Sequence, residues 1–150
     1  MKHRWAALVF VLALLALVPT AGTAQDSTPA RSRERTPGLG LGQNYPNPFN
    51  PTTTIPFTIG EQPCTDSGRR YRVSLRIFNV LAQLVAVPIL QGGDEAAGQP
   101  VENLQLGCGA KSAFWNGNYR NGSREVASGI YLYRLEVNGR AVVKKMIVIK

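Results

Sequence analysis

A chain of 150 residues, 44% of them hydrophobic and 17% charged, has room for one domain of ordinary size and not for a second core. Its formal net charge of +8 favours an anionic partner. Nucleic acid is not the expected partner, because the cations are scattered and no helix, zinc-ligand spacing or aromatic RNA-binding signature accompanies them.

The first 24 residues have the three parts of a secretory signal peptide. A basic start (Lys2 to Arg4) precedes an apolar run over 6–18, and the small residues that follow place the expected cleavage between Ala24 and Gln25. The run would make about 20 Å of helix, short of a hydrocarbon core of roughly 30 Å, so an uncleaved anchor is the less favoured alternative. We therefore expect the leader to engage the inner membrane transiently and the mature chain to be exported.

Residues 25–42 are polar, include two prolines, and show no apolar period. Such a composition predicts a flexible linker between the leader and a domain over residues 43–150. A basic arm that binds an anionic surface is the alternative, because three arginines fall in this stretch.

A proline-rich segment with interleaved aromatic residues opens the domain. Prolines fix φ and restrict the preceding residue, so the chain should enter extended and stiff. The aromatic side chains are expected to plug one end of the fold, although a polyproline docking motif is a second interpretation. The defining residues are Tyr45, Pro46, Pro48 and Phe49. Pro56 lacks an amide hydrogen, which should confine the strand over 53–59 to a sheet edge or a bulge.

Alternating apolar and polar residues predict strands through the middle of the chain. The clearest pattern covers 70–77, with apolar residues on one face. Arg70, Arg72 and Arg76 share the other face, as either a solvated stripe or a binding face. Further strands are expected at about 84–90, where Pro88 marks an edge or an end, and at 101–106 and 111–115. Turn chemistry between 116 and 125 includes Gly117 and Gly122.

Two paired strands are expected to end the chain. Alternate residues after Gly129 share one face, which is typical of a half-buried strand. Asn138-Gly139 favours a type I′ turn, so the chain should fold back over 141–149. Apolar residues occur on both faces of this last strand, so periodicity does not choose its inward face. The strands number seven with no convincing helix after residue 24, which predicts an all-β, antiparallel immunoglobulin-like β-sandwich.

Three aromatic residues of these strands could form a carbohydrate platform. At strand spacing they are expected in the core instead, because large aromatic side chains dominate the cores of sandwiches. They are Trp115, Tyr131 and Tyr133.

The chain has two cysteines, Cys64 and Cys108. In an exported chain an even count suggests a disulfide, and two unpaired thiols are the alternative. Closing this loop would be worth about 3 to 4 kcal/mol on the chain-entropy model. Two cysteines without a nearby histidine cannot complete a tetrahedral shell, so no metal is expected.

No catalytic constellation is visible in the sequence. The only histidine, His3, would leave with the signal peptide, which excludes histidine-based catalysis in the mature chain. The carboxylates show no paired spacing for acid–base chemistry, and no glycine loop opens a phosphate-binding helix. We therefore expect a non-enzymatic protein without a cofactor.

Several ordered blocks of the sequence resemble one known family. They are 41–53 (LGQNYPNPFNPTT), 73–82 (VSLRIFNVLA), 114–117 (FWNG), 126–135 (VASGIYLYRL) and Lys145-Met146. Together they resemble the type A C-terminal sorting domain of bacterial type IX secretion cargo, and the middle blocks are similar to the immunoglobulin-like module of flagellar hook-capping proteins. Asn116 stands where the family usually has aspartate, and Ala82 where it usually has glycine; both residues suit turns.

The resemblance implies a two-step route to the cell surface or medium. After the periplasm, the outer-membrane translocon recognises the folded domain, and its sortase releases the protein or joins it to anionic lipopolysaccharide. The family needs its last strand for recognition, and a receptor could read such a tail by strand addition and side-chain pockets. The matching residues are Lys144, Lys145, Met146, Ile147, Val148, Ile149 and Lys150.

Two interpretations of the whole chain stay open. Only a linker precedes the domain where the family usually has cargo, so either the domain itself is delivered or the chain is a relic or fragment. The alternative function is a free-standing immunoglobulin-like module whose arginine face (Arg70, Arg72 and Arg76) binds an anionic envelope polymer or a protein partner.

Overall fold

The computed structural model describes residues 38–150. The expected signal peptide, its cleavage between Ala24 and Gln25, and most of the expected linker lie outside the described residues and stay predictions. The strands are β1 (Leu39–Leu41), β2 (Thr53–Ile59), β3 (Arg70–Phe78), β4 (Leu84–Ala86), β5 (Ile89–Gln91), β6 (Leu104–Gly107), β7 (Gly109–Trp115), β8 (Gly129–Val137) and β9 (Arg140–Val148). A short 3-10 helix, η1 (Tyr119–Asn121), follows β7.

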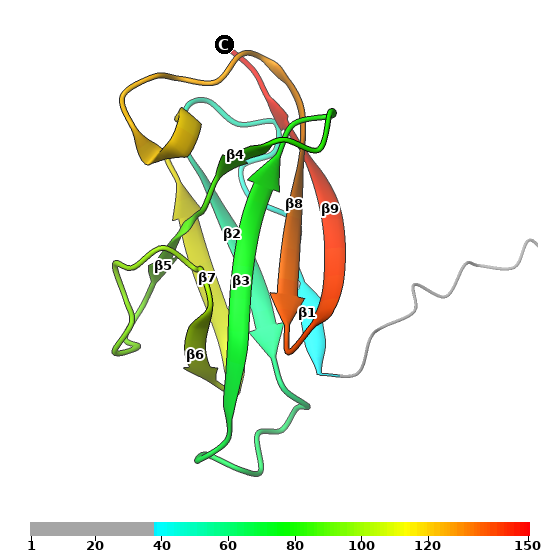
Figure 1. The fold of residues 1–150 in the computed structure, drawn as a ribbon, viewed down its shortest axis with the longest axis vertical. Helices are drawn as coiled ribbons and strands as arrows, with labels where there is room; N and C mark the ends of the chain where they lie inside the picture. The colour runs from blue at the N-terminus through cyan, green and yellow to red at the C-terminus, as the bar shows by residue number, and fades with distance from the viewer. Residues whose placement is uncertain (1–37) are drawn as a thin grey trace, which may run out of the picture. The chain divides into compact units, whose positions relative to one another are not determined.

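The strands form two antiparallel sheets that pack as a β-sandwich (Figure 1). One sheet has the order β1-β2-β7-β5, and the other has β4-β3-β8-β9 with β6 paired to β3. These orders correspond to strands A-B-E-D and C′-C-F-G of immunoglobulin domains, so the predicted fold class is confirmed. Many immunoglobulin domains have a tyrosine near the start of strand F whose hydroxyl hydrogen-bonds the backbone a few residues upstream. Tyr131 lies at the matching place in β8, and its hydroxyl donates to the Ala127 carbonyl at 2.9 Å.

The described residues form nine strands, where the sequence predicted seven. β1 lies in the stretch that was expected to be linker: Leu39 and Leu41 are buried and pair with β2. The linker prediction is therefore wrong for 39–41, and the sandwich begins by Leu39 rather than at residue 43. A three-residue strand of leucine and glycine is too short to register as an apolar period.

The expected strand over 84–90 is two strands in different sheets. β4 pairs with β3 in one sheet, while β5 pairs with β7 in the other. The chain crosses between the sheets at Val87-Pro88, so the proline does mark a strand end.

Pro56 lies inside β2, which has β7 on one side and β1 on the other, so the predicted edge position is wrong. The Pro56 carbonyl accepts the Gly42 N–H at 2.8 Å, which shows that the backbone groups of Pro56 face the β1 side. β1 ends at Leu41, so the missing amide hydrogen falls where that ladder stops, and pairing with β7 is unbroken.

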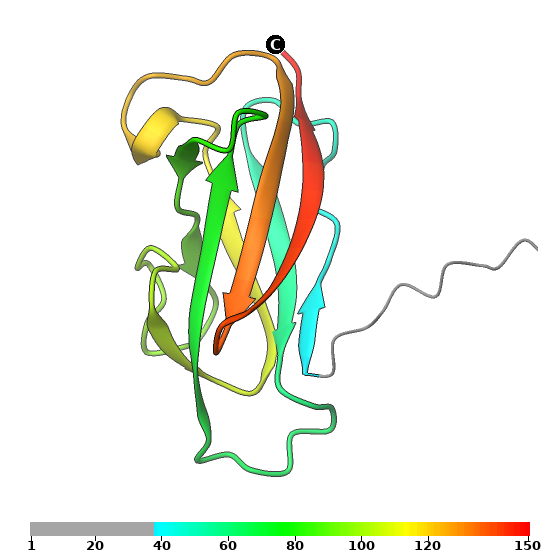
Figure 2. The ribbon, with the colours of Figure 1, turned by 45° about the vertical axis from the view of Figure 1, so that its right-hand side comes forward.

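The core lies between the two sheets, and its buried side chains run from Leu39 to Val148. Figure 2 shows β3, β8 and β9 as one layer in front of β2 and β7. Val73, Leu75 and Ile77 of β3 are fully buried, which confirms the face predicted from alternation. Every core residue of the described part belongs to this one sandwich.

The β8–β9 hairpin has the predicted two-residue turn, with Asn138 at φ 49° and Gly139 at φ 83°. The tertiary structure also settles the face of β9 that the sequence left open. Met146 and Val148 are 0% and 2% exposed, whereas Val143 is 51% exposed. The even-numbered residues therefore point inward.

Candidate functional site

β9 is an edge strand of the five-stranded sheet. Near the C-terminus, however, its outer edge is covered by another segment of the chain. The Phe49 N–H donates to the Ile147 carbonyl at 3.0 Å, and the Phe49 carbonyl accepts the Ile149 N–H at 3.0 Å. The Ile147 N–H also donates to Oδ1 of Asn47 at 2.9 Å. With β8 on its inner side, this part of β9 is held on both edges. We call the residues that cover it, 43–51, the proline clamp.

Buried side-chain hydrogen bonds hold the proline clamp in shape. Asn44 is 2% exposed, and its Nδ2 donates to Oγ1 of Thr53 at 3.0 Å and to the Pro46 carbonyl at 3.1 Å. The amide of Gln43 donates to the Lys145 carbonyl at 3.1 Å, which adds a contact to β9. Asparagine side chains often hydrogen-bond nearby backbone groups in turns, so the asparagines of the proline-rich segment were the local sequence signal for these bonds.

Tyr133 of β8 links the sheet to the start of the clamp. Its hydroxyl donates to the Gly42 carbonyl at 2.8 Å and accepts the Asn44 N–H at 3.2 Å. Burial of the ring raises the pKa of the Tyr133 hydroxyl above its ordinary value. Both hydrogen bonds join residues about ninety positions apart, so sequence reasoning assigned Tyr133 to the core and missed this link.

The aromatic residues of the clamp behave differently from each other. Phe49 is 1% exposed and packs edge-to-face on Trp115 at 5.4 Å between ring centroids. Trp115 packs in turn against Tyr131 at 6.0 Å, which confirms that these rings are core rather than a platform. Tyr45 is 60% exposed, so the expectation that it also plugs the sandwich is wrong.

Gly117 allows the clamp to approach the turn after β7. A Cβ at Gly117 would lie 2.2 Å from the Pro51 carbonyl oxygen, and its φ of 74° is one that glycine adopts without strain. Gly129 has a φ of 153° at the first residue of β8, and the Gly122 N–H donates to the Tyr119 carbonyl at 3.0 Å. Gly117 is therefore the glycine on which the clamp depends.

The predicted sorting residues divide into two faces. Met146 and Val148 are buried, and Lys144, which has the same parity, is half-buried. Lys145 and Ile149 are exposed, and Ile147 is half-buried on the outer face. Lys150 forms an ion pair with Glu125. Only the outer set is available to a partner while the domain stays folded.

The three arginines of the predicted arginine face differ in their surroundings. Arg70 and Arg72 are exposed, as expected. Arg76 instead hydrogen-bonds Glu102 through Nε at 3.0 Å and lies 3.8 Å from Glu136, and the hydrogen bond to Glu102 raises the pKa of its guanidinium. The charge of Arg76 is therefore matched by carboxylates from the segment before β6 and from β8.

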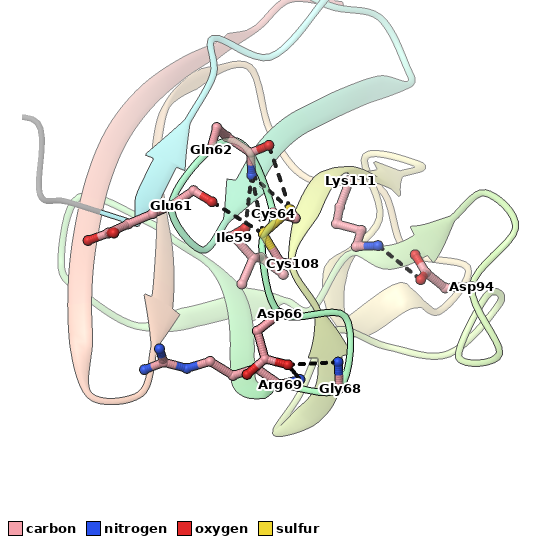
Figure 3. The surroundings of a disulfide bond; sticks show 10 residues. All are labelled: Ile59, Glu61, Gln62, Cys64, Asp66, Gly68, Arg69, Asp94, Cys108 and Lys111. Atoms are coloured by element: carbon pink, nitrogen blue, oxygen red, sulfur yellow. Dashed lines mark hydrogen bonds and ion pairs between the residues drawn. A yellow bond between two sulfur atoms is a disulfide. The ribbon is translucent and has the colours of Figure 1, made fainter.

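Cys64 and Cys108 form a disulfide, as the even count suggested. The bond ties the loop after β2 to the bend between β6 and β7, and both segments cross between the sheets. Figure 3 shows Gln62 over the sulfur atoms, with its Nε2 at 3.3 Å from Sγ of Cys64 and 3.4 Å from Sγ of Cys108. A Cβ at Gly60 would lie 2.8 Å from the Cys108 sulfur, so a side chain there would displace the bond.

The part of the chain that the structure describes has no cluster of metal-ligating side chains. Between residues 38 and 150 no three His, Cys, Asp or Glu side chains gather as a metal site. The Asp94–Lys111 pair, at 2.9 Å, is an ion pair at the same end as the disulfide (Figure 3). Over the same residues, no helix is long and apolar enough to cross a membrane.

Comparison with known proteins does not assign this chain to a family. No protein-family model matches the chain, and no curated protein is significantly similar to it. One solved structure is distantly similar, the Pseudomonas fluorescens alkylpurine DNA glycosylase AlkC bound to DNA containing an abasic site analogue, at 13% identity and a TM-score of 0.42. The match covers 75% of this chain and 30% of the glycosylase chain. A likeness at this level carries no inference about function.

Proposed function

We propose that this chain is a non-enzymatic, exported sorting module, recognised by a type IX outer-membrane translocon for secretion or attachment at the cell surface. The observation that carries the proposal is the proline clamp on β9. Two of the sequence blocks that resemble the sorting family, 41–53 and the C-terminal lysine-rich strand, contact each other through Phe49, Asn47 and Ile147. The signal that a receptor would read is thus held in one conformation by the domain itself.

The clamp also indicates how the signal is read. A receptor strand cannot pair with β9 at Ile147 and Ile149 while Phe49 occupies that edge. Recognition therefore uses side chains on the outer face, chiefly Lys145, Ile147 and Ile149, and the basic end at Lys150. A pre-ordered signal avoids the entropy cost of ordering a free tail on binding.

The test is export of a reporter inserted before Gly38, in a host with a working type IX translocon. Deleting residues 146–150 would be ambiguous, because it removes two buried core residues, Met146 and Val148. The sharper variant is Lys145→Gln with Ile149→Ser, which changes exposed side chains and leaves the core intact. We expect this variant to stay folded and to be retained in the periplasm.

Val143→Ser is the matched control, because Val143 is about as exposed as Ile149 and lies in β9, six residues earlier in the chain. Its fusion should reach the surface or medium like the wild type. Retention of the wild-type fusion, or normal export of the Lys145→Gln, Ile149→Ser variant, would refute the sorting function.

A free-standing binding module is the second candidate, and it has less support. Its arginine face retains Arg70 and Arg72 on the surface, but the charge of Arg76 is already matched by Glu102 and Glu136. An anionic polymer would meet two cations here instead of three.

A further inference from the structure

Aliphatic side chains gather at the end of the five-stranded sheet where the chain ends, and all of them are exposed except the half-buried Ile147. Two of them, Ile147 and Ile149, also belong to the proposed sorting signal. We call this group the apolar end patch: Val80, Leu81, Leu84, Ile130, Ile147 and Ile149. Val80 and Leu81 are 69% and 74% exposed. Single exposed aliphatic residues are common, but a continuous group of them usually marks an interaction site.

Strand register brings the patch residues that lie in strands together on the outer face of the sheet. Leu84 of β4 pairs with Phe78 of β3, and Phe78 pairs with Leu132 of β8, which gives an apolar row across three strands. Ile130 and Ile147 form the next row toward the chain end. The turn from β3 to β4 and the C-terminus lie at this same end in both views (Figures 1 and 2).

The turn that carries Val80 and Leu81 is stiff. Oδ1 of Asn79 accepts the N–H groups of Leu81 and Gln83 at 3.0 and 2.9 Å. The Asn79 N–H donates to the Gln83 carbonyl at 3.0 Å, and the Ala82 N–H donates to the Asn79 carbonyl at 3.0 Å. The two aliphatic side chains are therefore held outward in a fixed turn and do not collapse onto the sheet.

Cations lie on both sides of the apolar end patch. On one side, Lys145 of β9 pairs with Leu132 of β8. Arg120 and Arg124 stack on Tyr119 at the other side, where η1 adjoins β4. At this end of the described residues, the carboxylate of Glu125 forms an ion pair with Lys150. A second copy of the chain would bring these like charges together, whereas an anionic surface would complement them.

We propose that the apolar end patch docks on an anionic phospholipid bilayer, with Val80 and Leu81 entering the acyl boundary and the flanking cations meeting the headgroups. Aliphatic side chains on a rigid turn, flanked by Lys and Arg, combine the two contributions that hold proteins on such a surface. This docking does not depend on the sorting function.

The test is co-sedimentation of residues 33–150 with phosphatidylethanolamine vesicles that contain or lack phosphatidylglycerol. This part includes the whole core of the described residues, and a thermal unfolding experiment would check the fold of each variant. The wild type should bind the anionic vesicles, and Val80→Ser with Leu81→Ser should weaken binding by about tenfold or more. Arg124→Gln with Lys145→Gln should weaken it by about tenfold and reduce its salt dependence.

Val143→Ser changes an aliphatic side chain that is 51% exposed and lies outside the patch, and this variant should bind like the wild type. Absence of wild-type binding to anionic vesicles would overturn the proposal. So would unchanged binding of the double serine variant, because charge alone would then explain the attachment. Dimerisation of the wild type that the double serine variant abolishes, without vesicle binding, would assign the patch to a second copy. Loss of reporter export in that variant, again without vesicle binding, would assign it to a protein partner.

Discussion

Met146→Ala should strongly destabilise the domain, although only four residues follow Met146 in the sequence. Its side chain is 0% exposed between the sheets, and replacing a fully buried methionine by alanine costs about 2 to 5 kcal/mol. With a urea slope of about 2 kcal/mol per M, a loss of about 3 kcal/mol lowers the unfolding midpoint by about 1.5 M. Urea titration followed by tryptophan fluorescence measures this directly, because Trp115 is buried in the same core.

The control is Ile149→Ala, three residues further along the chain and directly after β9. Ile149 is 50% exposed, so this change should cost less than about 1 kcal/mol. Shifting β9 by one residue would exchange its faces and reverse this order. If Ile149→Ala proved the more damaging, the inward face assigned to β9 and the reading of its outer side chains by a receptor would both be wrong.

Three further outcomes are expected. Replacing Cys64 and Cys108 by serine should lower the unfolding free energy by about 4 kcal/mol, and reductant should then have no further effect on the urea midpoint. Gly117→Ala should cost more than about 2 kcal/mol in thermal unfolding, because its Cβ would strike the Pro51 carbonyl at a left-handed φ, while Gly93→Ala, with open space around it, should be nearly neutral. Tyr133→Phe should cost about 1 to 3 kcal/mol at neutral pH, because two buried backbone groups lose their partner. Since burial raises the pKa of Tyr133 in the folded chain, wild-type stability should also fall as the pH rises past about 10, and the phenylalanine variant should lose this part of the alkaline slope.

Much of the sandwich follows from local patterns. Alternation in β3 and β8 identified their inward faces, because a half-buried strand has a period of two and the large apolar residues of both strands recur at that period. The Asn138-Gly139 turn was equally clear, because few residue pairs tolerate two positive φ angles. Short or crossing elements were harder. β1 has three residues, and the boundary between β4 and β5 depends on which sheet each segment joins.

The candidate site depended much more on tertiary structure. The sequence identified the proline-rich segment and the C-terminal strand as separate blocks, but nothing local indicates that Phe49 pairs with Val148 or that Asn47 binds the Ile147 amide. It also placed Arg76 in a cationic stripe, because Glu102 and Glu136 reach that guanidinium only after β8 and the segment before β6 pack beside β3.

By itself the sequence determined the β-sandwich and the hairpin that ends it, because side-chain alternation and turn chemistry are local properties. The even cysteine count suggested a disulfide but left unpaired thiols open, and the tertiary structure places the two cysteines in a bond. Only the tertiary structure decided which face of β9 is buried, what covers its edge and where the exposed aliphatic residues gather. Those features arise from contacts between residues that lie far apart along the chain, and apolar residues on both faces of β9 leave the choice to the packing around it.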